Sequence, residues 1–282
     1  MTRLFPYVAG FIAGLSTLQL VTTQIVPDAR AASLGRAREP PSTESRRLSA
    51  VDPSPYAAVG TFKGTMSCMA SIVLHPRIIV TAAHCITERD GTTRSTKLSF
   101  RPGYPDGAHL SEFNASVWAV GSTQSFLAQS AHDASRDWAI LLLDHTPEQA
   151  RPFLLASDPY EPLRSLPRQI LLPRYSRNVP GGQVSGIDAA CSVRAMEWGV
   201  LIHDCGVSAG ASGAPLLVRH ADWYAVIGIN TAALLKFDES QHAMKFVGNS
   251  AVSAWSFANA LVTLVEHVNR GNDPEAIGPP AH

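Results

Sequence analysis

Many short apolar segments separated by Gly, Pro, Asn and Ser are the feature that most restricts how this chain can fold. From Tyr56 onward these segments have the length and spacing of β-strands. Short strands in series are typical of sandwiches and barrels, and not of α/β folds, in which a helix follows each strand. The pattern alone does not choose between a sandwich and a barrel. The predicted strands are 57–62, 69–74, 78–82, 117–121, 138–143, 169–172, 199–203, 215–218 and 224–230.

A proline-rich stretch divides the predicted strands into two groups. Prolines occur at positions 147, 152, 159, 162 and 167, where the strand pattern is lost. Near the C-terminal end, Ser256 can cap a helix whose apolar residues recur at helical spacing until Gly271. We therefore expect a first β unit at residues 56–150, a crossing segment at 151–168, a second β unit at 169–254, a helix at 255–270 and a tail at 271–282.

The first 31 residues have the order of an export signal. Arg3 supplies a positive charge, residues 7–21 are mostly apolar, and small residues surround a cleavage point after Ala31. An uncleaved signal anchor is the alternative, but polar residues interrupt the apolar stretch, which is shorter than the roughly 20 residues of a spanning helix. We expect a secreted or periplasmic protein without stable membrane insertion once the signal peptide, residues 1–31, is removed.

Residues 32–55 form a leader that has two interpretations. Four prolines and scattered arginines are typical of an unpacked, flexible segment. The basic pair Arg46-Arg47 also suggests a propeptide that is cut after this pair. The sequence leaves both interpretations open.

The four cysteines of an exported chain are expected to form disulfides, because these bonds persist outside the reducing cytosol. Cys68, Cys85, Cys191 and Cys205 allow three pairings, and their order suggests Cys68–Cys85 and Cys191–Cys205. A zinc site is the alternative. It is disfavoured because no two cysteines have the spacing of a structural zinc site, and we expect no bound metal.

Three residues at the ends of predicted strands could carry chemistry. His84 follows an apolar strand, and Ser212 lies between glycines in a turn with little bulk around its hydroxyl. Asp137 precedes the run 138–143, which has the pattern of a strand buried on both faces, so its carboxylate needs a partner. A serine hydroxyl is a weak nucleophile until a histidine takes its proton and a buried aspartate orients that histidine. The order His, Asp, Ser is that of chymotrypsin, whereas α/β-hydrolases place the serine first and subtilisins the aspartate first.

The strings around these residues resemble the trypsin-like serine peptidases of the chymotrypsin fold. The segment His203-Asp204-Cys205 is similar to the secreted, glutamyl-endopeptidase-like bacterial branch of that family. The resemblance covers about residues 56–268 and implies an all-β fold of two packed six-stranded antiparallel barrels, at 56–150 and 169–254, with a C-terminal helix. The matching strings are Thr81-Ala82-Ala83-His84-Cys85, Asp137-Trp138-Ala139-Ile140-Leu141 and Gly210-Ala211-Ser212-Gly213-Ala214-Pro215, and Cys68 fits the family's bridge to Cys85.

The resemblance implies a role for each matching residue. Ser212 would be the nucleophile, His84 the general base and then acid, and Asp137 the orienting carboxylate, with no cofactor. The backbone N–H groups of Gly210 and Ser212 would form the oxyanion hole. Two neighbouring aspartates, Asp133 and Asp144, are less suitable because the family's string surrounds only Asp137.

The pocket for the substrate side chain departs from the family pattern. Gly206 stands where trypsins carry an acidic residue, so Arg or Lys lacks a charge partner unless Asp204 substitutes. Asn230 stands where glutamyl enzymes carry a histidine. We expect a preference for a small or medium uncharged side chain on the acyl side of the cut. The expected pocket residues are Gly206, Val207, Asn230, Thr231 and Ala232.

The sequence therefore predicts an exported serine endopeptidase, monomeric, that cleaves protein or peptide substrates through an acyl-enzyme. Lys plus Arg and Asp plus Glu each number 23, and no basic run is present, which argues against a nucleic-acid partner. Two alternatives remain: a catalytically inactive, protease-like binding protein, and a narrow-specificity esterase or processing peptidase.

Overall fold

The computed structural model describes residues 46–47, 56–87, 97–103, 111–122, 131–148, 151–156, 169–176, 184–207, 209–220, 223–238 and 242–271. The predicted signal peptide, nearly all of the leader and most of the predicted tail lie outside the described residues, so these interpretations stay predictions. Among the described helices, none is long and apolar enough to span a membrane.

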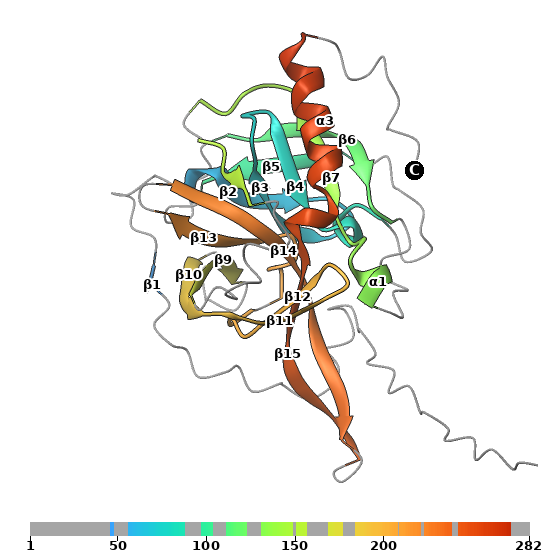
Figure 1. The fold of residues 1–282 in the computed structure, drawn as a ribbon. Coiled ribbons are helices and arrows are strands. Elements are labelled where there is room, and N and C mark those ends of the chain that lie inside the picture. Colours follow the sequence, from blue (N-terminus) through green and yellow to red (C-terminus); the bar gives the residue numbers. More distant parts are fainter. Residues whose placement is uncertain are drawn as a thin grey trace, which may run out of the picture.

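The first half of the chain is a closed antiparallel barrel with strand order β2-β3-β4-β7-β6-β5 (Figure 1). Every residue of β4 and β7 is buried, as the continuous apolar runs predict. A 3-10 turn, η1 (Tyr56–Ala58), precedes the barrel, and a short helix, α1 (Ala131–Ala134), precedes β7. The strands are β2 (Val59–Lys63), β3 (Ser67–Ile72), β4 (Ile78–Thr81), β5 (Leu98–Pro102), β6 (Phe113–Val120) and β7 (Ala139–Leu143).

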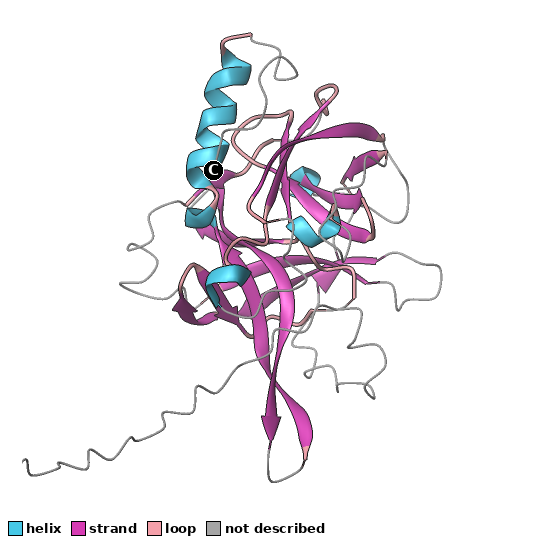
Figure 2. Cartoon of the chain, turned by 90° about the vertical axis from the view of Figure 1, so that its right-hand side faces the viewer, coloured by secondary structure: helices cyan, strands magenta, loops and turns pink. Residues whose placement is uncertain are grey.

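The second half is a half-barrel, built on the strand path β1-β10-β9-β13-β14-β15-β12-β11, with β8 parallel to β14. Figure 1 and Figure 2 show β14 and β15 continuing as a long hairpin beyond the rest of the sheet. The expected all-β fold, with a six-stranded antiparallel first barrel and a C-terminal helix, is confirmed. The second unit differs from the expected six-stranded antiparallel barrel, because its described strands form a nine-stranded half-barrel in which β8 is parallel to β14. The strands are β1 (Arg46–Arg47), β8 (Leu154–Leu155), β9 (Ile170–Ser176), β10 (Val184–Cys191), β11 (Val193–Glu197), β12 (Val200–His203), β13 (Pro215–His220), β14 (Trp223–Asp238) and β15 (Ala243–Ser253).

Part of the leader is paired with the second half. Strand β1 runs antiparallel to β10, with Arg46 opposite Ile187 and Arg47 opposite Gly186. The basic pair at which we expect propeptide cleavage is therefore placed at an edge of the sheet.

The C-terminal helix α3 (Ala258–Asn269) packs against the first barrel, although it follows the last strand of the second half (Figure 1). The ring of His267 stacks on Trp118 of β6, with 5.6 Å between ring centroids. Gly271, at φ +70°, ends the helix as predicted. The predicted cap at Ser256 is wrong, because Ser256 belongs to the 3-10 turn η4 (Ala254–Ser256) and Phe257 takes the cap position without a side-chain bond.

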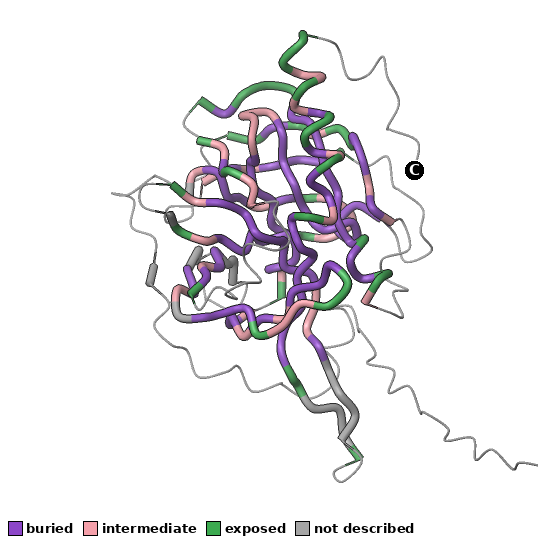
Figure 3. Tube along the Cα trace, in the orientation of Figure 1, coloured by how far each residue is buried: buried purple, intermediate pink, exposed green. Residues whose placement is uncertain are grey.

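Both predicted disulfides are present, Cys68–Cys85 and Cys191–Cys205. Ligand atoms of Cys68, Cys85 and His84 lie within 4.8 Å of one another, the arrangement that a metal site would need. The two sulfurs are bonded to each other and provide no thiolate, so the zinc alternative is wrong at these cysteines. The first bridge ties β3 to the turn after β4, and both of its cysteines are buried. Figure 3 shows that buried residues fill the middle of the molecule and that exposed ones lie toward its outside.

Replacing Cys68 and Cys85 together by alanine should lower the free energy of unfolding by about 3 kcal/mol, because the bridge closes a loop of 17 residues in the unfolded chain. Urea unfolding followed by tryptophan fluorescence measures the change. An unfolding midpoint equal to that of the unchanged protein would contradict this role for the bridge.

Candidate active site

His84 lies in a 3-10 turn, η2 (Ala83–Cys85), directly after β4. Several contacts hold this turn, among them the bridge from Cys85 to Cys68, a hydrogen bond from Thr87 Oγ1 to the Ala83 carbonyl at 3.0 Å, and one from Thr65 N to the Cys85 carbonyl at 2.9 Å. The imidazole is itself buried, with 5% of the residue exposed. The backbone around His84 is therefore fixed before any contact of the ring is considered.

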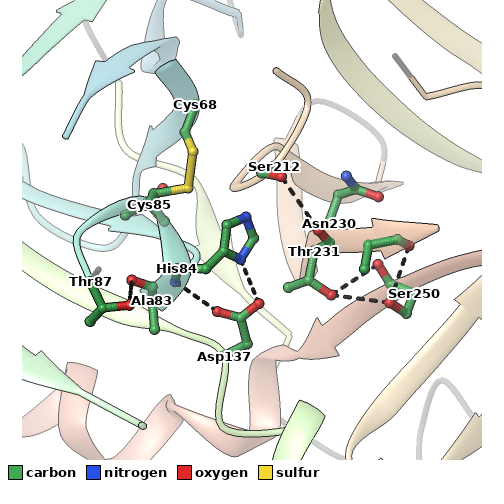
Figure 4. A network of polar contacts seen from close by, with 12 residues as sticks. Cys68, Ala83, His84, Cys85, Thr87, Asp137, Ser212, Asn230, Thr231 and Ser250 are labelled. Carbon is green, nitrogen blue, oxygen red and sulfur yellow. Dashed lines mark hydrogen bonds and ion pairs between the residues drawn. A yellow bond between two sulfur atoms is a disulfide. The ribbon is translucent and has the colours of Figure 1, made fainter. Parts of the chain in front are cut away.

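Asp137 accepts two hydrogen bonds from His84 (Figure 4). Its Oδ1 accepts from the backbone N–H at 2.9 Å, and its Oδ2 lies 2.7 Å from Nδ1 of the ring. The strand register explains the meeting, since Thr81 at the end of β4 pairs with Ala139 at the start of β7. A carboxylate accepts hydrogen bonds, so Nδ1 carries the proton and Nε2 is left with a lone pair.

The two neighbouring aspartates lie elsewhere. Asp133 is half exposed beside His132, and Asp144 accepts a hydrogen bond from Asn114 Nδ2 at 2.8 Å and pairs with His145. Of the three aspartates near position 137 that the structure describes, Asp137 is the one bonded to His84. The preference for Asp137 over its neighbours agrees with this geometry.

Ser212 comes from the second half and lies on the side of the His84 ring opposite Asp137 (Figure 4). Its hydroxyl donates to the Thr231 carbonyl at 3.3 Å, and its own carbonyl accepts from Met69 N on β3 at 2.7 Å. The latter bond joins the serine turn to the first barrel. The structure thus brings together His84, Asp137 and Ser212 from three distant parts of the sequence.

The turn that carries Ser212 needs glycine at position 213. Gly213 has φ +81°, and an added Cβ would lie 2.1 Å from the Met69 carbonyl oxygen and 2.3 Å from Thr81 Oγ1. Thr81 Oγ1 also donates to the Met69 carbonyl at 2.7 Å, so neither neighbour can move freely. The close approach of the two halves at this point depends on the missing side chain.

Two backbone N–H groups of the turn are available for a ligand. Gly210, at φ +96°, and Ser212 donate to no acceptor among the residues that the structure describes. Paired, unsatisfied N–H groups beside a nucleophile are what an oxyanion hole requires.

The expected pocket residues differ in burial and in their hydrogen bonds. Val207 and Ala232 are half-buried, and Gly206 is buried, with its N–H donating to Asp188 Oδ2 at 2.7 Å. Thr231 lies beside the serine hydroxyl, and its own hydroxyl bonds to the carbonyl and hydroxyl of Ser250 at 3.2 Å each.

Asn230 does not present its amide as a free pocket group. Its Nδ2 donates to the Ala211 carbonyl at 3.1 Å, and its Oδ1 lies 3.1 Å from Nε2 of His203. Asp204, considered above as a substitute acid for the pocket, is paired with Arg194 and accepts from Ser192 N at 2.7 Å.

Sequence reasoning missed two buried residues behind the site, Asp188 and His203. Asp188 contacts the pocket wall at Gly206, and His203 contacts Asn230. Burial lowers the pKa of His203 to about 4, and the hydrogen bond to Asn230 only partly opposes this effect. Side chains alternate between the two faces of a strand, so the sequence of β12 could have indicated that His203 faces inward. No local pattern predicts that its partner is Asn230.

Comparison with known proteins agrees with this geometry. A family model described as Trypsin matches residues 47–251. A solved structure titled "Structure of Glu endopeptidase in complex with MPD" superimposes with a TM-score of 0.55 and 17% sequence identity, covering 81% of this chain and 97% of that chain. At this identity the likeness shows the fold. No curated protein matches the chain in sequence.

Gly213→Ala should displace the serine turn, because the added methyl meets backbone and side-chain oxygens at 2.1 and 2.3 Å. We expect ester hydrolysis to fall by about 10²-fold, the typical cost of a shift of about 1 Å in a catalytic group. Gly271→Ala is the matched control, since Gly271 also has positive φ but nothing lies within 4 Å of an added Cβ. Equal activity in the two variants would contradict the steric argument.

Buried His203 should make the folded protein less stable in mild acid. The unfolded chain binds a proton at the ordinary pKa of about 6.5, whereas folded His203 binds it only near pH 4. Stability from this residue is therefore complete above pH 6.5 and is lost as the pH falls to about 4, by about 3 kcal/mol in total.

Urea unfolding of Ser212→Ala and of Ser212→Ala/His203→Gln at pH 7 and pH 4.5 isolates this contribution, because glutamine does not titrate. The loss of stability on acidification should be smaller in the double variant. The same loss in both proteins would show that His203 does not contribute.

Proposed function

This chain belongs to the trypsin family and is a serine endopeptidase, and we propose that Ser212, His84 and Asp137 are its catalytic triad. The observation that carries the proposal is the pair of hydrogen bonds from His84 to Asp137, at 2.9 and 2.7 Å. These bonds leave the lone pair on Nε2, on the side of the ring that faces Ser212 (Figure 4). A base with this tautomer is what the serine hydroxyl needs in order to become a nucleophile.

The proposed reaction has two stages. Ser212 Oγ attacks the carbonyl carbon of the scissile bond while its proton passes to Nε2 of His84, and the resulting oxyanion accepts from the N–H groups of Gly210 and Ser212. His84 then gives the proton to the leaving amine, and the acyl group stays on Ser212. Water deprotonated by His84 releases the acid and restores the serine. Asp137 remains a carboxylate throughout and stabilises the imidazolium.

We propose that the pocket takes a small or medium uncharged side chain. The glutamyl endopeptidase of similar fold acts, as its name says, at Glu, but an acidic side chain here would approach buried Asp188 behind Gly206. A basic side chain would lack an acid on the pocket surface, because Asp204 is already paired with Arg194 and the Asp188 carboxylate lies behind the Gly206 backbone, which donates to it. The proposed preference therefore rests on the negative charge of Asp188 against acidic side chains and on the lack of an accessible acid for basic ones.

We also propose that the enzyme acts outside the cytosol, secreted or periplasmic, as a monomer after removal of the signal peptide at residues 1–31. Two disulfides and the family support this location. The leader at 32–55, the barrels at 56–150 and 169–254 and the crossing segment at 151–168 remain the proposed division of the chain.

Ser212→Ala and His84→Ala should each lower kcat on a panel of short peptides and esters by about 10⁴–10⁶-fold, while leaving the fold intact. His132→Ala is the matched control, because His132 is an exposed histidine outside the site. Activity on esters but not on peptides would favour the narrow esterase. A rate of hydrolysis in either catalytic variant equal to that of the wild type would contradict the triad. A wild-type protein that hydrolyses none of the substrates would favour the binding-protein alternative.

A further inference from the structure

His203 is a buried histidine directly behind the serine turn, and the proposed reaction gives it no role. It ends β12 and is completely buried. Its Nε2 lies 3.1 Å from Oδ1 of Asn230 on β14, a residue that is 3% exposed. A polar contact this deep in the core constrains the orientation of both side chains, because neither can turn to water.

Asn230 in turn holds the serine turn from three positions. Its backbone N–H donates to the Ala214 carbonyl at 2.8 Å, and its carbonyl accepts from Gly213 N at 2.7 Å. Its side-chain Nδ2 donates to the Ala211 carbonyl at 3.1 Å, which also accepts from Ala214 N at 3.0 Å. Of these contacts, the one from Nδ2 is the one that depends on how the amide is oriented.

The Ala211 carbonyl belongs to the same peptide group as the N–H of Ser212. A trans peptide is planar, so its C=O and N–H point in opposite directions. A hydrogen bond that fixes the Ala211 carbonyl therefore also fixes the direction of the Ser212 N–H, one of the two proposed oxyanion donors. The contact from Asn230 thus reaches the oxyanion hole through a single rigid group.

The orientation of the Asn230 amide depends on His203. A carbonyl oxygen only accepts hydrogen bonds, so the NH₂ group must face Ala211 and Oδ1 must face His203. His203 Nε2 must then carry the proton and donate. Without this donor Oδ1 would be buried without a partner, and a rotated amide would place its oxygen against the Ala211 carbonyl.

We propose that His203 is a positioning residue that, through Asn230, orients the peptide group between Ala211 and Ser212 and so aims the Ser212 N–H at the oxyanion. The inference rests on the proposed function of the same site. His203 touches no reacting atom, and its effect on the reaction passes through the Asn230 amide.

The test compares three replacements of His203 in the full-length enzyme. His203→Leu and His203→Met remove the donor, and the flexible Met side chain provides a second donor-free variant if Leu does not fold. His203→Gln retains an N–H donor near the place of Nε2. We expect kcat for a peptide ester to fall about 10–100-fold in the donor-free variants with KM changed less than about 2-fold, and kcat to return to within about 5-fold in His203→Gln.

The affinity for a peptidyl trifluoromethyl ketone, compared with the affinity for the parent peptide amide, distinguishes a defect of the oxyanion hole from a general structural defect. The bound oxygen of the ketone occupies the oxyanion hole, so its affinity should fall in parallel with kcat, while the affinity for the parent peptide amide should not. His132→Gln is the control for replacing a histidine, because His132 is exposed and lies outside the site.

Three outcomes are decisive. Loss of kcat without the donor and recovery with Gln would support the inference. If the wild-type enzyme is active, two results would overturn this inference and leave the proposed function standing. One is a kcat in all three variants equal to that of the wild type, and the other is an equal loss of kcat in His203→Leu, His203→Met and His203→Gln. An inactive unchanged enzyme would overturn the proposed function and this inference with it.

Discussion

The rest of the site depends on the buried carboxylate of Asp137, which needs partners for both oxygens because an unpaired charge in the core is costly. His84 supplies a partner for each oxygen, one from its backbone and one from its ring. This is possible because β4 and β7 pair in a register that brings the end of one strand to the start of the other. The closed barrel thus sets the orientation of the imidazole, and the disulfide at Cys85 keeps the turn in place.

The serine turn is held from both halves of the molecule. The first barrel contributes the bond from Met69 N to the Ser212 carbonyl, and the absence of a side chain at Gly213 lets the two backbones approach. The second half contributes the three bonds of Asn230. Because neither half supplies both sets of contacts, the geometry around Ser212 requires that the halves are docked, and α3 packed on the first barrel strengthens that docking.

Features with a local cause could be predicted from the sequence, and features with a distant cause could not. Each of the nine predicted strands overlaps a strand of the structure, and the two disulfides and the grouping of His84, Asp137 and Ser212 follow from short motifs. Strands β5, β10, β11 and β15 were not predicted. The cap at Ser256 was wrong because Ser253 caps the 3-10 turn η4, which includes Ser256, and α3 begins only after Phe257. The contacts of His203 and Asp188 join residues 27 and 18 positions apart, and no motif marks such pairs before the sheet register is known.

In the proposed mechanism His84, held by Asp137, activates Ser212. The most direct measurement is the rate at which a fluorophosphonate labels the disulfide-intact protein, with the labelled residue identified by peptide mapping, for the unchanged chain and for Asp137→Asn. We expect labelling at Ser212, slower by about 10⁴-fold in Asp137→Asn, because the amide favours the wrong tautomer of His84. Equal rates in the two proteins, or labelling at another residue, would contradict the activation of Ser212 by His84.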